Sequence, residues 1–247
     1  MTTDDDERSP FTRPGFIAAA VVVALVVVLG IVLMVVNAND EDDPRPTPTS
    51  SMATTSAAPT SDTTAAAGGE SVCGLDGEVM TGTVTAAPEG EWKFQGTIGY
   101  PTSSTYGPGE TSPEGVRSCF QHSPIGALFM AANAVAQGSD AATSAQWASQ
   151  ALADGRYRDE LLAQVSGGSS SEGTRLTIAG FRILDYDGAT ARVDLGTRVS
   201  SEGQNVTMSA VYELVWQDGD WKISSDVQAP IDAASIPDLA GYITWGE

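Results

Sequence analysis

Hydrophobic residues recur at every second position over residues 176–227, the spacing of β-strands that bury one face. The phase of this alternation changes between Ile178 and Phe181, which predicts a β-bulge. Asp187-Gly188 and Asp218-Gly219-Asp220 are turn sequences that separate the hydrophobic runs. The pattern therefore predicts an antiparallel meander with one buried face.

The residues before the meander have helical spacing. Ser123 is a suitable N-cap, Pro124 fits the first position, and the apolar stripe of this helix, which ends at Gly138, is Ile125, Leu128, Phe129 and Ala132. We expect a second helix over residues 141–153, capped by Asp140, and a third with Tyr157, Leu161, Leu162 and Val165 that ends at Gly167-Gly168. Helices followed by a curved meander predict an α+β fold, with the helices packed on the concave side of the sheet.

Two regions flank this pattern. Trp92, Phe94 and Ile98 alternate with polar residues and predict a short strand, whereas the prolines and glycine of residues 100–108 predict a loop. The tail over residues 230–247 carries Leu239, Tyr242, Ile243 and Trp245 among helix and strand breakers. It either wraps the domain or offers an exposed apolar surface.

Near the N-terminus, Phe16–Val36 is a run of 21 residues without a charged or strongly polar side chain. A helix rises about 1.5 Å per residue, so this run spans the roughly 30 Å hydrocarbon core of a bilayer. A helix in lipid also satisfies its own backbone polar groups. We therefore predict a cytoplasmic tail over residues 1–15 and a single transmembrane helix over residues 16–37.

The charges around this segment predict its orientation. Arg8 and Arg13 precede it, whereas an acidic run over residues 40–43 follows it, so we expect the C-terminal part to lie outside the cytoplasm. A cleaved signal peptide with the small-residue site Val36-Asn37-Ala38 is the alternative, although the apolar core of such a signal is usually shorter. Both interpretations export the rest of the chain.

Residues 38–72 are rich in Ser, Thr, Pro and Ala and show no hydrophobic periodicity. Such a segment cannot bury enough surface to offset its loss of conformational entropy, so we expect a disordered linker. Its composition resembles an exposed stalk. The remainder, Cys73–Glu247, is then one extracytoplasmic domain of 175 residues.

The chain is strongly acidic, with 32 acidic and 12 basic residues and a formal net charge of −20. Phosphate contacts dominate nucleic-acid affinity, so this charge argues against binding to DNA or RNA. It also disfavours adsorption onto anionic lipid headgroups.

Cys73 and Cys119 are the two cysteines, and both follow the apolar segment. An even pair in an oxidising compartment most often forms a disulfide. A redox-active pair is the alternative, although no CxxC motif is present. The chain has one histidine, His122, and no nucleotide-binding or metalloprotease motif, so we expect neither a metal site nor a cofactor.

Two sets of residues carry a resemblance over roughly residues 90–245. Val211–Ile223, a strand–turn–strand, is similar to the final hairpin of domains in the nuclear transport factor two-like (cystatin-like cone) superfamily. Gly99-Tyr100-Pro101, Tyr106-Gly107-Pro108 and His122–Leu128 resemble a set of uncharacterised membrane-anchored proteins of high-GC Gram-positive bacteria. The layout of short tail, single helix and cone-shaped outer domain is similar to bitopic scaffold subunits of conjugative type IV secretion systems.

The candidate site is a pocket or loop–helix junction near the first predicted helix, formed by Tyr100, Pro101, Tyr106, His122, Ser123 and Pro124. The resemblance implies that some relatives are enzymes with a buried acid or base in the cone, and His122 is the candidate here. A histidine that closes the helix entrance is the alternative, because acid–base catalysis also needs a placed partner. The aspartates fall at predicted turns, so we expect none on the cone-lining face: Asp185, Asp187, Asp218 and Asp220.

We expect a non-catalytic, membrane-tethered interaction or scaffold protein with a protein partner in the cell envelope. The resemblance in layout implies an accessory role in a cell-envelope or conjugative transfer assembly. One alternative is a module that binds a small molecule or peptide in the cone, and another is a cone enzyme that uses His122. A cone filled by its own side chains would argue against both alternatives. The sequence does not indicate an oligomeric state.

Overall fold

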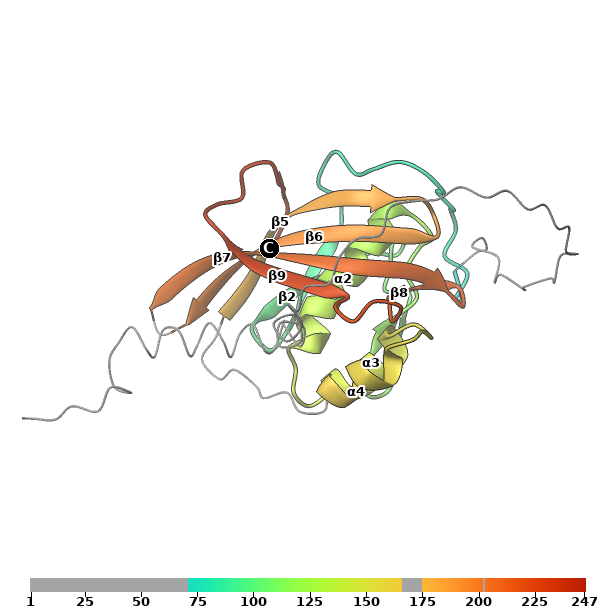
Figure 1. Ribbon diagram of the computed structural model, residues 1–247. Helices are drawn as coiled ribbons and strands as arrows, with labels where there is room; N and C mark the ends of the chain where they lie inside the picture. Colours follow the sequence, from blue (N-terminus) through green and yellow to red (C-terminus); the bar gives the residue numbers. More distant parts are fainter. Residues whose placement is uncertain (1–70, 166–174, 202) are drawn as a thin grey trace, which may run out of the picture.

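The computed structural model describes residues 71–165, 175–201 and 203–247 (Figure 1). The predicted cytoplasmic tail, the predicted transmembrane helix, nearly all of the linker and Gly167-Gly168 lie outside the described residues. Within the described ranges, no helix has both the length and the apolar character needed to cross a membrane.

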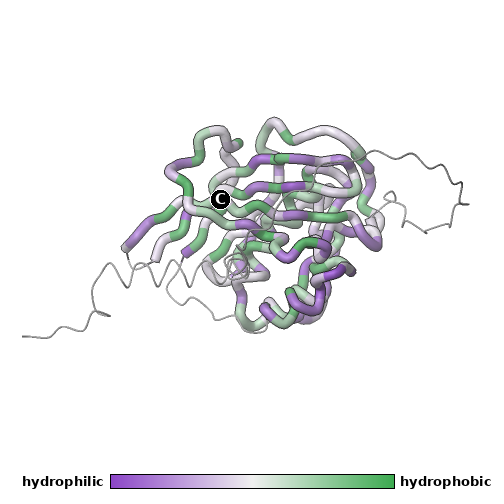
Figure 2. Tube along the Cα trace, in the orientation of Figure 1, coloured by the Kyte–Doolittle hydropathy of each residue, from purple (hydrophilic) through white to green (hydrophobic). Residues whose placement is uncertain are grey.

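An antiparallel sheet forms the body of the domain, as the period-two pattern predicts. Its strands are β5 (Arg175–Tyr186), β6 (Thr190–Ser201), β7 (Gln204–Gln217), β8 (Asp220–Ile223), β9 (Ile231–Ile236) and β10 (Ile243–Thr244). The strand order is β10-β5-β6-β7-β8, and β9 also pairs with β7. Hydrophobic and hydrophilic residues alternate along β6 and β7 (Figure 2).

Local chemistry sets the register of this sheet. The β5–β6 pairing shifts between Ile178 and Gly180, which confirms the predicted β-bulge, and shifts again between Ile183 and Asp185. The Asp187 carboxylate accepts hydrogen bonds from the amides of Ala189 (3.0 Å) and Thr190 (2.6 Å), which closes the turn before β6.

Three helices pack with the sheet in the described chain, so the fold is α+β as predicted. They are α2 (Pro124–Gly138), α3 (Ser144–Ala151) and α4 (Arg158–Val165). The Ser123 hydroxyl accepts a hydrogen bond from the Gly126 amide at 3.0 Å, which confirms the predicted N-cap. The predicted start of α3 is wrong, because Asp140 closes a turn through the Ala142 amide and the helix begins three residues later.

Helix α2 and the sheet enclose the hydrophobic core. Leu128 and Phe129 of α2 are buried, as are Val193, Leu195 and Tyr212 of the facing strands. Full burial of one such side chain stabilises the fold by about 1.5–3 kcal/mol. The space between helix and sheet is therefore occupied by the side chains of the domain itself.

Two small hairpins precede α2. One pairs β1 (Glu91–Gln95) with β2 (Ile98–Thr102), and the other pairs β3 (Glu110–Thr111) with β4 (Arg117–Ser118). The prediction of a loop from residue 100 onward is wrong at its start, because Tyr100 and Pro101 belong to β2 and pair with Lys93 and Trp92. This strand tolerates a proline because Pro101 lies in a two-stranded hairpin, where its missing donor leaves no central ladder incomplete.

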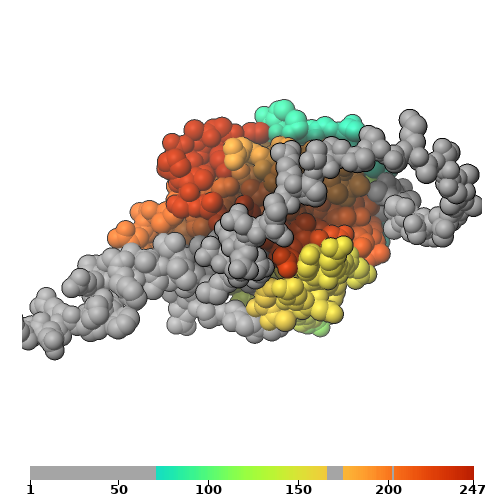
Figure 3. All heavy atoms as spheres, viewed as in Figure 1, coloured from blue at the N-terminus to red at the C-terminus, as the bar shows by residue number. Residues whose placement is uncertain are grey.

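The C-terminal tail wraps the domain, which decides between the two expectations for it. Trp245 is buried, and its ring packs against those of Phe129 and Phe181 at centroid distances of 5.6 and 5.5 Å. A Cβ atom at Gly180 would lie 2.9 Å from the backbone oxygen of Ile243, so the tail needs a glycine beneath it. Figure 3 shows the C-terminal residues in red massed against the orange strands.

A buried carboxylate fastens this tail to the sheet. Asp194 has no exposed surface and accepts hydrogen bonds from Arg182, from the Ser209 hydroxyl at 2.7 Å and from the Tyr242 hydroxyl at 2.8 Å. The hydrogen bond to Asp194 raises the pKa of Arg182. Alternation alone places Asp194 on a polar, solvent-facing side, and the tail that crosses this side buries it.

Replacing Asp194 with asparagine is expected to destabilise the domain by about 2 kcal/mol, because it leaves Arg182 and Tyr242 without their shared acceptor charge. The matched control is Glu213→Gln, which removes the exposed Arg192–Glu213 pair and costs below about 1 kcal/mol. Urea unfolding of both variants measures the difference. Equal stability losses would show that the tail is not held by this carboxylate.

Candidate functional site

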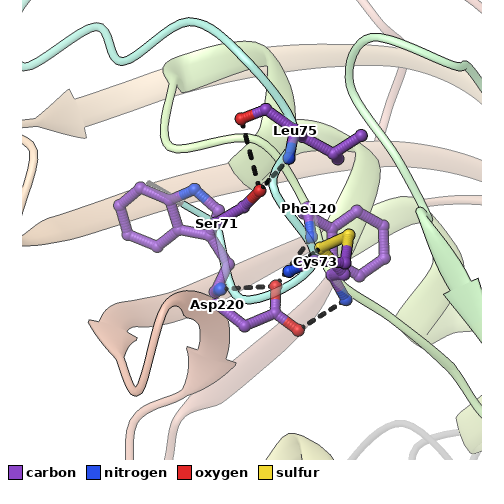
Figure 4. The surroundings of a disulfide bond; sticks show 7 residues. Ser71, Cys73, Leu75, Phe120 and Asp220 are labelled. Carbon is purple, nitrogen blue, oxygen red and sulfur yellow. Dashed lines mark hydrogen bonds between the residues drawn. A yellow bond between two sulfur atoms is a disulfide. The ribbon is translucent and has the colours of Figure 1, made fainter. Parts of the chain in front are cut away.

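The first described residues are fastened to the turn between β7 and β8 (Figure 4). The Val72 amide donates a hydrogen bond to the Gly219 carbonyl at 2.7 Å. Cys73 forms a disulfide with Cys119, which confirms the predicted pairing. The closed loop of about 45 residues contributes roughly 4 kcal/mol in the chain-entropy account of disulfides.

Asp220 connects this disulfide to the sheet. The left-handed turn at Asp218 (φ 56°) and Gly219 (φ 76°) directs the Asp220 carboxylate inward. The carboxylate accepts hydrogen bonds from the backbone amides of Cys119 at 2.7 Å, Phe120 at 2.8 Å and Trp221 at 2.9 Å. Asp220 lies beside the predicted turn, but its contacts reach far beyond it, since two of its partners lie about a hundred residues earlier.

Two effects oppose each other at this carboxyl group. Burial raises the pKa of Asp220 to about 6, and the three amide hydrogen bonds lower it less than burial raises it. The ionised carboxylate has enough lone pairs for all three amides, whereas an amide side chain would direct a donor at one of them. The Asp220 carboxylate therefore anchors the chain through its hydrogen bonds, although burying the ionised form costs free energy at neutral pH.

His122 lies just before α2 with 1 % of its surface exposed. Its Nε2 is 2.5 Å from the Gly188 carbonyl oxygen and its Nδ1 is 3.0 Å from a carboxylate oxygen of Glu78. Each ring nitrogen therefore faces an oxygen, the Gly188 carbonyl on one side and the Glu78 carboxylate on the other. The ring also stacks on Trp216 at a centroid distance of 3.9 Å.

The geometry of His122 indicates a role in fastening. It connects the segment before β1, through Glu78, to the turn after β5, through Gly188. A general base needs a nitrogen that can reach the substrate proton, and here both nitrogens are engaged. Glu78 is the carboxylate beside His122, and its side chain is 39 % exposed at the domain surface.

Tyr100 and Pro101 belong to a different polar network, centred on Arg117. The Arg117 guanidinium lies 3.7 Å above the Tyr100 ring and donates to Asn133 Oδ1 at 2.7 Å. Asn133 in turn donates to the Pro101 carbonyl at 2.9 Å. Burial lowers the pKa of Arg117. This network connects β2 and β4 to the middle of α2.

Tyr106 lines an open groove beside the β1–β2 hairpin. The groove runs between the start of β1 and the loop after β2, and most of its lining is polar. Its walls are Leu75, Glu89, Gly90, Glu91, Lys93, Thr102, Ser103, Ser104, Thr105, Tyr106, Pro108 and Gly109. Hydroxyl and carboxylate groups that face solvent suit contacts with a polar ligand or partner.

The structure therefore divides the six predicted site residues among three places. Tyr100 and Pro101 join the Arg117 network, Tyr106 lines the groove, and His122 and Ser123 form the entrance to α2, where Pro124 is the first residue. The lining of this groove includes Tyr106 and none of the other five predicted residues.

Sequence reasoning missed Arg117, Glu78 and the long-range role of Asp220. The pair Asn133 and Gln137, four residues apart on an otherwise apolar helix, was the available signal for Arg117, since buried polar side chains require partners. Among the described residues, no group of three or more His, Cys, Asp or Glu side chains is placed to hold a metal ion.

Comparison with known proteins gives one family. The model of a family described as Domain of unknown function (DUF8175) matches residues 52–244, which is most of the chain. No curated protein and no solved structure matches the chain. The chain therefore belongs to the DUF8175 family.

The stability difference between the native chain and Asp220→Asn is expected to depend on pH. The folded state holds the Asp220 proton more tightly than the unfolded chain, whose carboxyl titrates near pH 4. Protonation of Asp220 therefore adds to the free energy of unfolding below about pH 4. This contribution, about 3 kcal/mol at most, is lost as the pH rises through about 6.

Chemical denaturation of both proteins between pH 4 and pH 7 measures this difference, and effects shared by both cancel. Asp220→Asn should be destabilised throughout, by a margin that shrinks as the pH rises. A margin independent of pH would contradict the burial of a titrating carboxyl at this position.

His122→Phe is expected to lower the free energy of unfolding by about 2–3 kcal/mol, because stacking on Trp216 survives but the buried Gly188 carbonyl loses its donor. Glu78→Gln keeps an acceptor for the ring and should cost under about 1 kcal/mol, since Glu78 is partly exposed. Thermal unfolding followed by tryptophan fluorescence compares the two. A fully stable His122→Phe protein would refute the fastening role.

Proposed function

We propose that this member of the DUF8175 family is a non-catalytic interaction protein, held outside the cytoplasm by a single transmembrane helix over residues 16–37 and a linker over residues 38–72. Its outer domain is a nuclear transport factor two-like cone that has lost an open interior. Its role is that of an accessory or scaffold in a cell-envelope or conjugative transfer assembly, as the layout suggests.

The observation that carries this proposal is the fastening of residues 71–73. A disulfide persists in oxidising compartments, which agrees with an exported domain. The chain enters the domain at this bond, and Val72 and Asp220 tie it at once to the β7–β8 turn. A tether that pulls on residue 71 therefore pulls on the sheet and does not peel away residues 74–118.

Two further features support a non-catalytic role. The interior between α2 and the sheet is filled by core side chains, as a cone without a substrate pocket would be. His122, the candidate acid or base, has both ring nitrogens engaged with the Gly188 carbonyl and Glu78. An enzyme of this superfamily would need such a group to face an open cavity.

The groove beside the β1–β2 hairpin is the surface that we assign to the partner. It is open, polar and lined at its start by Glu89, Glu91 and Lys93. Such a lining is typical of the wet, polar rim of a protein interface. The alternative function is the binding of a small molecule or peptide. For that function, too, the groove offers a binding surface outside the filled interior.

The distribution of lysine makes the proposal testable in intact cells. The chain has only two lysines, Lys93 in the groove and Lys222 in β8. A membrane-impermeant amine cross-linker added to cells should join the full chain to an envelope protein through Lys93. The cross-link should disappear in Lys93→Arg and persist in Lys222→Arg, which keeps the same charge and fold.

Two results would contradict this proposal. If the lysines react only after the cells are lysed, the domain faces the cytoplasm. If the cross-linked protein is captured equally by Lys93→Arg, the groove is not the contact surface.

A further inference from the structure

We propose that β9 pairs with β9 of a second copy of this chain, which joins two sheets edge to edge in antiparallel fashion. The inference starts from one margin of the sheet. Strands β8 and β9 follow one another along the same edge of β7, since β8 pairs with residues 214–217 and β9 with residues 207–212. The β8 half of this edge is covered by another part of the chain, whereas no described strand covers the β9 half.

The β8 half is covered by the connection between α3 and α4. Leu152 forms a parallel bridge with Ile223, and the Ala153 amide donates to the Ile223 carbonyl at 2.9 Å. Helix α3 contacts β8, and Figure 1 shows α4 on the far side of α3. In the parts of the chain that the structure describes, no strand pairs with the outer side of β9.

The register identifies the backbone groups on this open side. The Glu213 amide donates to the Pro230 carbonyl at 2.8 Å, so Pro230 faces β7. Direction alternates along an antiparallel strand, and the next residues that face β7 are Asp232, Ala234 and Ile236. Ile231, Ala233 and Ser235 then direct their N–H and C=O groups away from β7.

This edge has little of the usual protection against pairing. Edge strands are normally protected by charged side chains, especially lysine, by proline, by a bulge or by being very short, and Asp232 is the one charged side chain of β9. The β9 segment contains neither lysine nor proline, and its six pairs with β7 follow without a register shift. Pro230 and Pro237 lie just outside it and limit the exposed edge to the strand itself.

A second copy fits this edge because the three outward residues are symmetric about Ala233. Placing Ala233 opposite Ala233 of the second copy aligns Ile231 with Ser235 and Ser235 with Ile231. All three outward positions then face outward positions, which gives about six N–H···O=C bonds. No other self-pairing register aligns all three.

Charge also suits this register. Asp232 is the one charged residue of β9, and it falls opposite Ala234 of the second copy, so no two carboxylates meet directly. Side chains directly opposite one another in an antiparallel ladder attract when their charges are opposite and repel when their charges are alike. Tethering to one membrane, which is part of the proposed function, raises the effective concentration of copies towards the millimolar range.

Charge placed at Ala234 tests the pairing and its register together. Ala234 is exposed, so neither lysine nor glutamate there disturbs the core. Ala234→Glu faces Asp232 of the second copy at two symmetric positions and should raise the dimer Kd about tenfold, whereas Ala234→Lys should lower it by a similar factor. Sedimentation equilibrium of the purified full chain in density-matched detergent measures both.

A second pair of variants tests the backbone contribution. Ser235→Pro removes an outward amide that β7 does not use and should weaken the dimer at least about tenfold, while Ser235→Ala keeps that amide and should stay within about twofold. Circular dichroism verifies the fold of each variant. Association through the predicted transmembrane helix would not respond to any of these changes.

The proposal is overturned if the native chain stays monomeric up to about 1 mM, the range of effective concentrations that tethering creates. It is also overturned if dimers form but ignore the charge at position 234. These outcomes are separate from the lysine cross-linking in cells, because edge pairing is measured on purified protein. A cytoplasmic domain would refute the proposed function and leave the pairing test intact.

Discussion

The bond between the Asp220 carboxylate and the amides of Cys119 and Phe120 is the contact on which the rest of the domain depends. It joins the end of the meander to the segment that leads into α2. The disulfide to Cys73 adds the start of the domain to the same point. Apolar packing between α2 and the sheet is not directional, so this bond helps to fix how the segment before α2 meets the sheet.

Other buried polar groups also join separate segments of the chain. His122 ties Glu78 to Gly188, Arg117 ties β2 to α2, and Asp194 ties the C-terminal tail to the sheet. Each connects segments far apart in sequence, and each has hydrogen-bond partners for its buried atoms. These buried polar groups therefore have a structural use. In the described part of the chain, the groove beside β1–β2 and the edge of β9 are open features.

Local patterns in the sequence predicted local structure well. The caps of α2, the turns at Asp187 and Asp218 and the bulge near Gly180 depend on residues a few positions apart. Long-range contacts were not accessible in this way. Nothing in the alternation indicates that the tail buries Asp194, or that Asp220 reaches Cys119 across the domain. The six candidate site residues are near one another in sequence, yet the fold sends their side chains to three separate places.

The proposed function depends on a domain that is closed by the Cys73–Cys119 disulfide and that keeps this bond in the cell. Thiol trapping in living cells tests this directly. Cells are quenched in acid, the unfolded full chain is alkylated before and after reduction, and the mass is measured. The account predicts that Cys73 and Cys119 are alkylated only after reduction. Alkylation of both without reductant would show that the bond does not exist in the cell and would contradict the account.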